Sequence, residues 1–142
     1  MTVLDASCLV SLLRGEPGQS DVVAALTGDC VMNVLNRAEV VDRLVRGGAV
    51  ADDVGADLDT LGIVFEPLTV DLADAAARLR GRYYARTERP VSMADCVALA
   101  TAMKQGSALA TSDAVLALVT VAVQCQLVRI ANSKGDYPLR ET

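Results

Sequence analysis

The sequence of 142 residues contains no histidine. Histidine supplies the imidazole of Ser-His-Asp and Cys-His catalytic groups and is a common nitrogen ligand for metals, so sites of these kinds are excluded. General-base chemistry must then come from a carboxylate, a lysine, a tyrosine or a metal-bound water. This absence narrows the possible functions more than any other feature of the composition.

Aromatic side chains are also scarce, at 3% with no tryptophan, although 52% of the residues are hydrophobic. A core of this composition must consist of alanine, valine and leucine, which is typical of helices packed on a parallel sheet. A chain of this length is the usual size of one domain. Disordered, collagen-like and low-complexity classes are excluded.

Closely spaced cysteines and long apolar runs are missing as well. Cys8, Cys30, Cys96 and Cys125 are far apart, without a C-x-x-C pattern, and the chain does not open on a signal-like segment. We therefore expect free, buried thiols and a cytoplasmic protein. The longest mostly apolar stretch, 114–130, is interrupted by two glutamines and an arginine and is shorter than the roughly 18–20 residues of a membrane span, so no membrane segment is expected.

Basic residues are the minority, with 13 against 18 acids and a net charge of −5. A chain with this balance does not adhere to nucleic acid or to a membrane surface through its net charge. Binding of a polyanionic substrate would require positively charged residues near the binding site.

Hydrophobic periodicity divides the chain into alternating strands and helices. Short apolar runs predict five strands, at 2–4, 30–32, 63–65, 108–111 and 127–130. Helical patterns lie at about 8–13, 20–26, 33–46, 51–61, 70–86, 92–104 and just after residue 113, with Ser20 and Ser92 expected as caps. This alternation indicates an α/β fold in which a short parallel sheet carries helices on both faces. We expect one domain over 1–132 and a polar C-terminal tail at 133–142.

Two aspartates directly follow predicted strands. Asp5 ends the first strand and Asp113 follows the fourth. In open parallel sheets, chemistry gathers outside the carboxyl ends of the strands. A half-buried carboxylate there is costly unless a cation compensates it, but an aspartate is also a favoured helix cap. Taken alone, neither position distinguishes a cap from a functional acid.

Two further acids lie on predicted helices. Glu39 precedes Arg43 by one turn, which also fits a solvated ion pair. Asp95 shares a helix face with apolar residues that should point inward, whereas Ser92-x-x-Asp95 also fits a capping box. In a chain without histidine, two acids at strand ends and two on helices match a hard-oxygen site for Mg²⁺ or Mn²⁺.

Four pieces of the chain resemble the motifs of the PIN-domain ribonucleases, in the order and spacing of the VapC toxins of bacterial toxin–antitoxin pairs. These pieces are Val3-Leu4-Asp5-Ala6-Ser7, Asn36-Arg37-Ala38-Glu39-Val40, Ser92 to Ala100 and Thr111-Ser112-Asp113. The resemblance spans about residues 3–130 and implies that 1–132 form a PIN domain. It further implies a metal-dependent endoribonuclease that hydrolyses RNA phosphodiester bonds, a cognate antitoxin that covers the site, and a homodimer.

The resemblance also implies the site residues. Asp5, Asp95 and Asp113 match acids that hold the metal, and Glu39 matches a fourth acid that binds it, directly or through water, or orients the attacking water. Many relatives carry a further acid two or three residues beyond the last aspartate. Val115 and Leu116 occupy those places, so the residues for a second tightly held metal are not matched. The supporting positions are Ser7, Asn36 and Thr111, of which Asn36 would orient the Glu39 carboxylate or a metal-bound water.

Cationic help for an RNA substrate is expected in the segment 78–89, which holds five of the 13 bases beside two tyrosines. Arginine with interleaved aromatics suits single-stranded RNA by charge and stacking. We expect Arg82, Arg86 and Arg89 to share a side of one helix and contact RNA. The alternative is a solvated helix face with Tyr83 in the core.

The partner surface is expected on the early helices. Leu9, Leu12, Leu13 and the stretch 40–44 offer more apolar side chain than one sheet face can bury.

Other classes fit the sequence less well. A phosphatase of the haloacid dehalogenase type needs a second aspartate two residues after Asp5, where Ser7 stands. A response-regulator receiver also presents acids at strand ends, but its pair of adjacent early acids and its late lysine are not evident. The remaining alternative is a catalytically inactive PIN-like module that binds RNA or protein.

Overall fold

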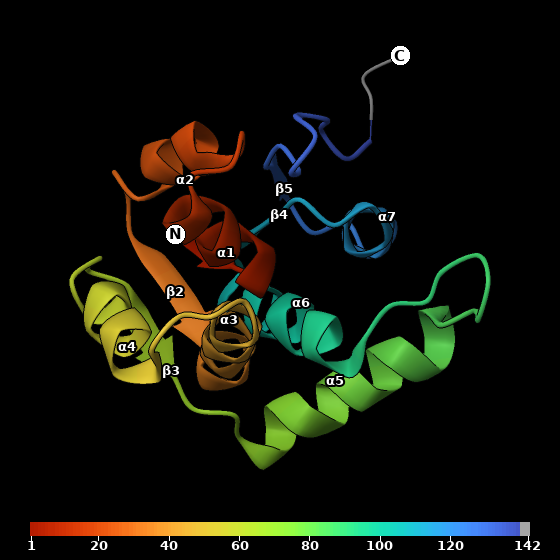
Figure 1. Cartoon of the computed structure of the whole chain (residues 1–142). Helices are drawn as coiled ribbons and strands as arrows, with labels where there is room; N and C mark the ends of the chain where they lie inside the picture. Colours follow the sequence, from red (N-terminus) through yellow and green to blue (C-terminus); the bar gives the residue numbers. More distant parts are fainter. Residues whose placement is uncertain (140–142) are drawn as a thin grey trace.

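The computed structural model describes residues 1–139, in which strands and helices alternate (Figure 1). The strands are β1 (Thr2–Leu4), β2 (Cys30–Asn33), β3 (Val64–Glu66), β4 (Ala108–Thr111) and β5 (Leu127–Arg129). The helices are α1 (Ala6–Arg14), α2 (Gln19–Ala25), α3 (Val34–Arg46), α4 (Ala51–Asp59), α5 (Val70–Tyr83), α6 (Met93–Gln105) and α7 (Ala114–Ala122). The predicted α/β class is confirmed.

The five strands form one parallel sheet in the order β3-β2-β1-β4-β5. Val3 in the central strand β1 pairs in register with Val31 of β2 and with Leu109 of β4. From β1 the chain adds β2 and β3 on one side of this central strand, and it then adds β4 and β5 on the other side. The strand order therefore switches between β1 and β4. Ligands of open α/β sheets bind outside the carboxyl ends of the strands at such a switch point. Receiver domains have the order 2-1-3-4-5, so that alternative is wrong.

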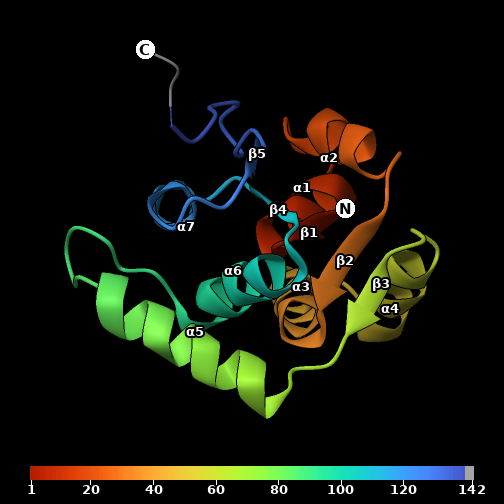
Figure 2. The same ribbon diagram turned by 180° about the vertical axis from the view of Figure 1, so that it is seen from behind.

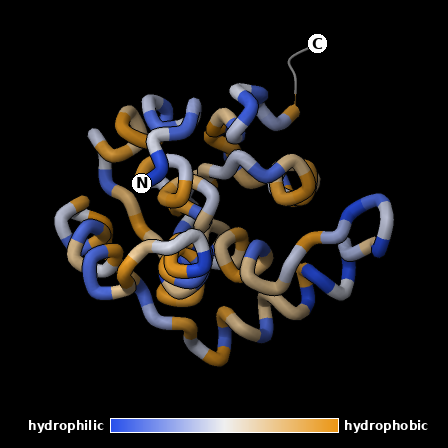
Figure 3. Tube along the Cα trace, in the orientation of Figure 1, coloured by the Kyte–Doolittle hydropathy of each residue, from blue (hydrophilic) through white to orange (hydrophobic). Residues whose placement is uncertain are grey.

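Each face of the sheet is covered by its own helices (Figures 1 and 2). Leu4 and Met32 pack with α1 to α4, whereas Val3 and Val31 pack with α5 to α7. This division follows from the two-residue repeat of a strand, which sends neighbouring side chains to opposite faces. Figure 3 shows the resulting mixture of apolar and polar residues along most helices. The sheet is therefore buried on both sides, and only its ends are open for chemistry.

Several predicted boundaries are wrong by one to three residues, among them the end of α4, which lies at Asp59 and not at residue 61. Gly18 rather than Ser20 stands at the N-cap of α2. Strand β3 begins one residue later than expected, at Val64. Helix α5 ends at Tyr83 and not near residue 86, because Tyr84 adopts extended backbone and an antiparallel bridge between Ala85 and Arg89 closes a turn behind it.

The thiols and the tail also differ in part from expectation. Cys8, Cys30 and Cys96 are free and buried, but Cys125 is only half-buried. The start of the predicted polar tail packs on α2, where the Tyr137 hydroxyl donates a hydrogen bond of 3.0 Å to Asp21. The end of that tail, residues 140–142, lies outside the described residues. Within 1–139, no helix has the length and apolar character needed to cross a membrane.

Candidate active site

Asp5 lies at the carboxyl end of β1 and is 2% exposed. It is the N-cap of α1, and its Oδ1 accepts a hydrogen bond of 3.2 Å from the backbone N–H of Cys8. The same oxygen accepts a bond of 2.5 Å from the Ser7 hydroxyl, and Oδ2 accepts one from the Thr111 hydroxyl at the end of β4. Burial raises the pKa of Asp5, while these hydrogen bonds act in the opposite direction. Asp5 is thus both a cap and a buried acid.

Asp113 is joined to this network through the segment that follows β4. Its backbone N–H donates to the Thr111 hydroxyl at 2.9 Å, and the neighbouring Ser112 N–H donates to the Ser7 hydroxyl at 3.0 Å. The Asp113 side chain is exposed and caps α7 through a bond of 2.8 Å from the N–H of Leu116. Two hydroxyls, Ser7 and Thr111, therefore tie the ends of β1 and β4 together.

Glu39 lies on α3, whose start follows the end of β2. Asn36, one turn earlier and fully buried, donates from Nδ2 to Glu39 Oε1 at 3.0 Å and to the Ala94 carbonyl at 3.1 Å. Burial raises the pKa of Glu39, and the charge of Asp5 adds to this effect. The predicted orienting contact from Asn36 is present, and no Glu39–Arg43 ion pair forms among the described side chains.

Asp95 combines the two roles that the sequence left open. Its side chain accepts from the N–H of Ser92, and the Ser92 hydroxyl accepts from the N–H of Asp95, so the capping box at the start of α6 is present. Burial first, and then the negative charges of Asp113 and Asp5, raise the pKa of Asp95 to about 7. The negative charges of Asp5 and Asp113 therefore both act on the Asp95 carboxylate.

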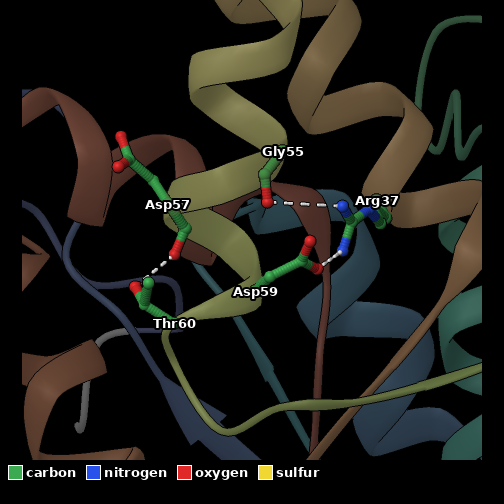
Figure 4. Close-up of polar contacts among 5 residues, drawn as sticks. All are labelled: Arg37, Gly55, Asp57, Asp59 and Thr60. Atoms are coloured by element: carbon green, nitrogen blue, oxygen red, sulfur yellow. Dashed lines mark hydrogen bonds and ion pairs between the residues drawn. The ribbon is translucent and has the colours of Figure 1, made fainter.

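Arg37 shows that not every residue of these motifs faces the site. Its guanidinium reaches α4, where Nη1 lies 2.7 Å from Asp59 Oδ1 and Nη2 donates to the Gly55 carbonyl (Figure 4). It also stacks over the Phe65 ring, 4.5 Å from its centroid. Arg37 therefore links α3, on which Asn36 and Glu39 lie, to α4 by hydrogen bonds and an ion pair, and to β3 by ring stacking.

The donor set fits a hard divalent cation. All four acids offer oxygen ligands, none of them forms an ion pair among residues 1–139, and the fully buried Asn36 keeps an Oδ1 atom without a hydrogen-bond partner. No group of three or more acidic or cysteine side chains in the described chain has metal-holding geometry. Mg²⁺ keeps several waters and takes one or two carboxylates directly, so an all-protein cage is not required.

The raised pKa of Asp95 predicts how the metal-free protein responds to pH. An acid whose pKa is about 7 in the folded chain and 3.8 when unfolded favours the protonated folded state, so stability falls as pH rises between those values. Asp5 and Glu39 act in the same direction. We expect thermal unfolding in EDTA to show a gain of about 1–3 kcal/mol between pH 8 and pH 5.5. Asp95→Asn should be more stable than the wild type at pH 8 and lose most of this gain, whereas an unchanged profile in that variant would contradict the prediction.

The expected RNA-contacting arginines do not share one helix side. Arg82 lies on α5 over the Tyr83 ring, whereas Arg86 and Arg89 lie in the turn beyond the helix. Arg89 Nε donates to the Tyr83 carbonyl at 2.8 Å, so its guanidinium helps to close that turn. The shared face predicted from the sequence is wrong because α5 ends at Tyr83, and RNA contact by these arginines stays a prediction.

The early helices offer less apolar surface than expected, and docking of a partner there stays a prediction. Leu9 and Val40 are fully buried, Leu44 is 8% exposed, and Leu12 and Leu13 pack against the same core. The sheet face buries more of these side chains than expected because α1 and α3 lie directly on it.

Sequence reasoning missed two features of the site. The buried Cys8 thiol donates to Asp5 Oδ1 at 3.4 Å and to the Ala110 carbonyl at 3.2 Å, which the three-residue spacing after a cap could have suggested. Arg14 and Arg43 line a pocket that Asp113 also lines, and no motif in the sequence marks them.

The comparisons with known proteins agree with this architecture. A model of the PIN domain family matches residues 2–134, which is nearly the whole chain. The chain therefore belongs to the PIN domain family. The family named by the sequence motifs is confirmed, and a comparison with curated protein sequences finds no match.

Several solved structures share the fold. VapC20 of Mycobacterium tuberculosis, described as a sarcin-ricin loop cleaving toxin, has a TM-score of 0.70 and 18% identity over 83% of this chain and 94% of that chain. A toxin–antitoxin complex from Klebsiella pneumoniae has a TM-score of 0.62 and 17% identity over 80% and 87% of the two chains. FitAcB from Neisseria gonorrhoeae has a TM-score of 0.62 and 21% identity over 89% and 96%.

Proposed function

We propose that this protein is a cytoplasmic Mg²⁺- or Mn²⁺-dependent endoribonuclease toxin that a cognate antitoxin inhibits. The observation that carries the proposal is the placement of Asp5 and Asp113 just after β1 and β4, with Asp95 of α6 near enough for both of their charges to raise its pKa. Such a concentration of negative charge favours a bound cation. Membership of the PIN domain family and likeness to solved toxin structures add support.

Each residue has a distinct role in this proposal. Asp5, Asp95 and Asp113 would hold the metal, which when bound supplies positive charge to the phosphate and lowers the pKa of a water. Ser7 and Thr111 orient the Asp5 carboxylate.

Glu39 acts on the attacking water. Asn36 fixes Oε1 of this carboxylate, which leaves Oε2 to orient the water or to accept its proton. Burial raises the pKa of Glu39 toward neutral pH, which suits this carboxylate to accept a proton from the attacking water.

The first test is the metal requirement. We expect the purified protein to cleave structured RNA in Mg²⁺ or Mn²⁺ and to lose at least about a hundredfold of that rate in excess EDTA, with recovery when metal is added back. The rates are measured by gel electrophoresis of labelled RNA. Undiminished cleavage in EDTA would contradict the metal mechanism, and RNA binding without cleavage in any metal would favour the inactive module.

The second test concerns partners. An acidic site attracts cations, so we expect an antitoxin to place an arginine or lysine near the four acids and to compete with metal. The likeness to structures of toxin–antitoxin complexes supports such a partner, and we also propose a homodimer. Light scattering measures the oligomeric state, and co-purification with the neighbouring gene product tests for the antitoxin. A monomer whose neighbour neither co-purifies nor slows cleavage would favour a stand-alone nuclease.

A further inference from the structure

A polar pocket of about 380 Å³ opens beside the candidate active site, between α1, α3, the start of α7 and the segment after β5. Asp113, Ser7 and Ser112 line it, so the pocket and the candidate active site share residues. The arginines Arg14 and Arg43 line it as well. Both are exposed, and neither forms an ion pair with a carboxylate in the described chain.

The two arginines are positioned by the fold. Arg14, at the end of α1, donates from Nη2 to the carbonyl of Arg43 near the end of α3, at 3.4 Å. A guanidinium has five N–H donors, so this single bond leaves most of them for a ligand. Arg43 is near enough to Glu39 for its charge to lower the pKa of that carboxylate. Its positive charge therefore reaches both the pocket and the candidate active site.

From this arrangement we infer that the pocket binds a phosphate of the RNA strand adjacent to the bond that is cut, through Arg14 and Arg43. The planar guanidinium group of arginine donates paired hydrogen bonds to phosphate oxygens. The inference rests on the proposed function and deepens it. A chain with a net charge of −5 and an acidic active site needs such local cations to hold a polyanion. The carboxylate of Glu16 also lines the pocket and opposes this binding.

The test measures RNA binding in EDTA, where cleavage is not required. Fluorescence anisotropy with a labelled single-stranded RNA of mixed sequence gives the affinity, and NMR titration with inorganic phosphate identifies the residues that contact the anion. We expect Arg14→Gln and Arg43→Gln each to weaken RNA binding about three- to tenfold and to reduce the slope of log affinity against log salt by about 0.7. Arg14→Lys keeps the charge and loses the fork, so its loss should be smaller.

Matched variants separate this site from general electrostatics. Arg46→Gln removes the same charge from the next turn of α3, where Arg46 pairs with Asp42, and should leave the affinity unchanged. Glu16→Gln should tighten binding.

Each outcome decides one proposal. The phosphate site would be overturned if Arg46→Gln lost as much RNA affinity as the other two variants, or if Arg14→Gln and Arg43→Gln lost none. This holds even if the protein cleaves RNA. Variants that keep their RNA affinity but lose antitoxin binding would also overturn it and assign the pocket to the partner. Binding that depends on both arginines, in a protein that cleaves in no metal, would leave the phosphate site standing and refute the nuclease.

Discussion

Asp5→Asn is expected to reduce RNA cleavage by at least about a hundredfold while the protein stays folded. An asparagine side chain retains an oxygen that can accept the bond from the Cys8 N–H, and asparagine caps helices as well as aspartate does. The substitution therefore removes a negative charge from a buried ligand position, and the Thr111 hydroxyl has to turn so that it accepts from the new amide instead of donating. Initial rates measure the loss, and circular dichroism with thermal unfolding measures the fold.

Asp95→Asn provides the companion experiment, with the same expected loss of rate. Its matched control is Asp53→Asn, which removes an exposed carboxylate from the first turn of α4, far from the strand ends that carry the site. The control should retain full activity. Wild-type rates in folded Asp5→Asn or Asp95→Asn protein would mean that these acids serve only as caps.

Gly18→Ala is expected to have the largest effect on stability. A Cβ atom at this position would lie 2.3 Å from the Ala131 carbonyl oxygen and 2.8 Å from Ile130 Cγ2, so the start of α2 has to move away from the segment after β5. Backbone cannot yield as a flexible side chain does, and we expect a loss of about 2–4 kcal/mol. Chemical denaturation gives the free energy of unfolding.

Gly81→Ala is the control for this substitution. Gly81 lies within α5, and a Cβ atom there would meet nothing within 4 Å. Alanine favours the helix, so this variant should gain about 0.5–1 kcal/mol. A Gly18→Ala protein as stable as the wild type would show that the two segments do not pack as closely as described.

The sequence predicts a helix or strand well where the local residue pattern alone determines its ends. Helix α3 has a capping residue, a regular apolar stripe and a glycine stop, and its observed range, Val34–Arg46, differs from the predicted 33–46 by one residue. The end of α5 depends instead on the Ala85–Arg89 bridge and on Arg80, which donates to the Val91 carbonyl and stacks over Tyr84. These contacts form only when the chain folds back on itself, so no local sequence pattern predicts them.

The same division applies to the candidate site. Positions after strands and on helices were enough to nominate the acids, and the resemblance to PIN-domain ribonucleases implied the contact between Asn36 and Glu39. Arg14 and Arg43 could not be nominated, because a surface arginine acquires its role from the elements beside it. The distance between α1 and the end of α3 is set by tertiary packing and is absent from any local pattern.

The placement of three acids at helix starts separates folding from activity in an unusual way. Asp5 and Asp113 are N-caps, and Asp95 lies in the first turn of α6 beside its cap, Ser92. Asparagine caps a helix about as well as aspartate. One substitution at Asp5 or Asp113 can therefore inactivate the proposed nuclease and still leave a folded chain.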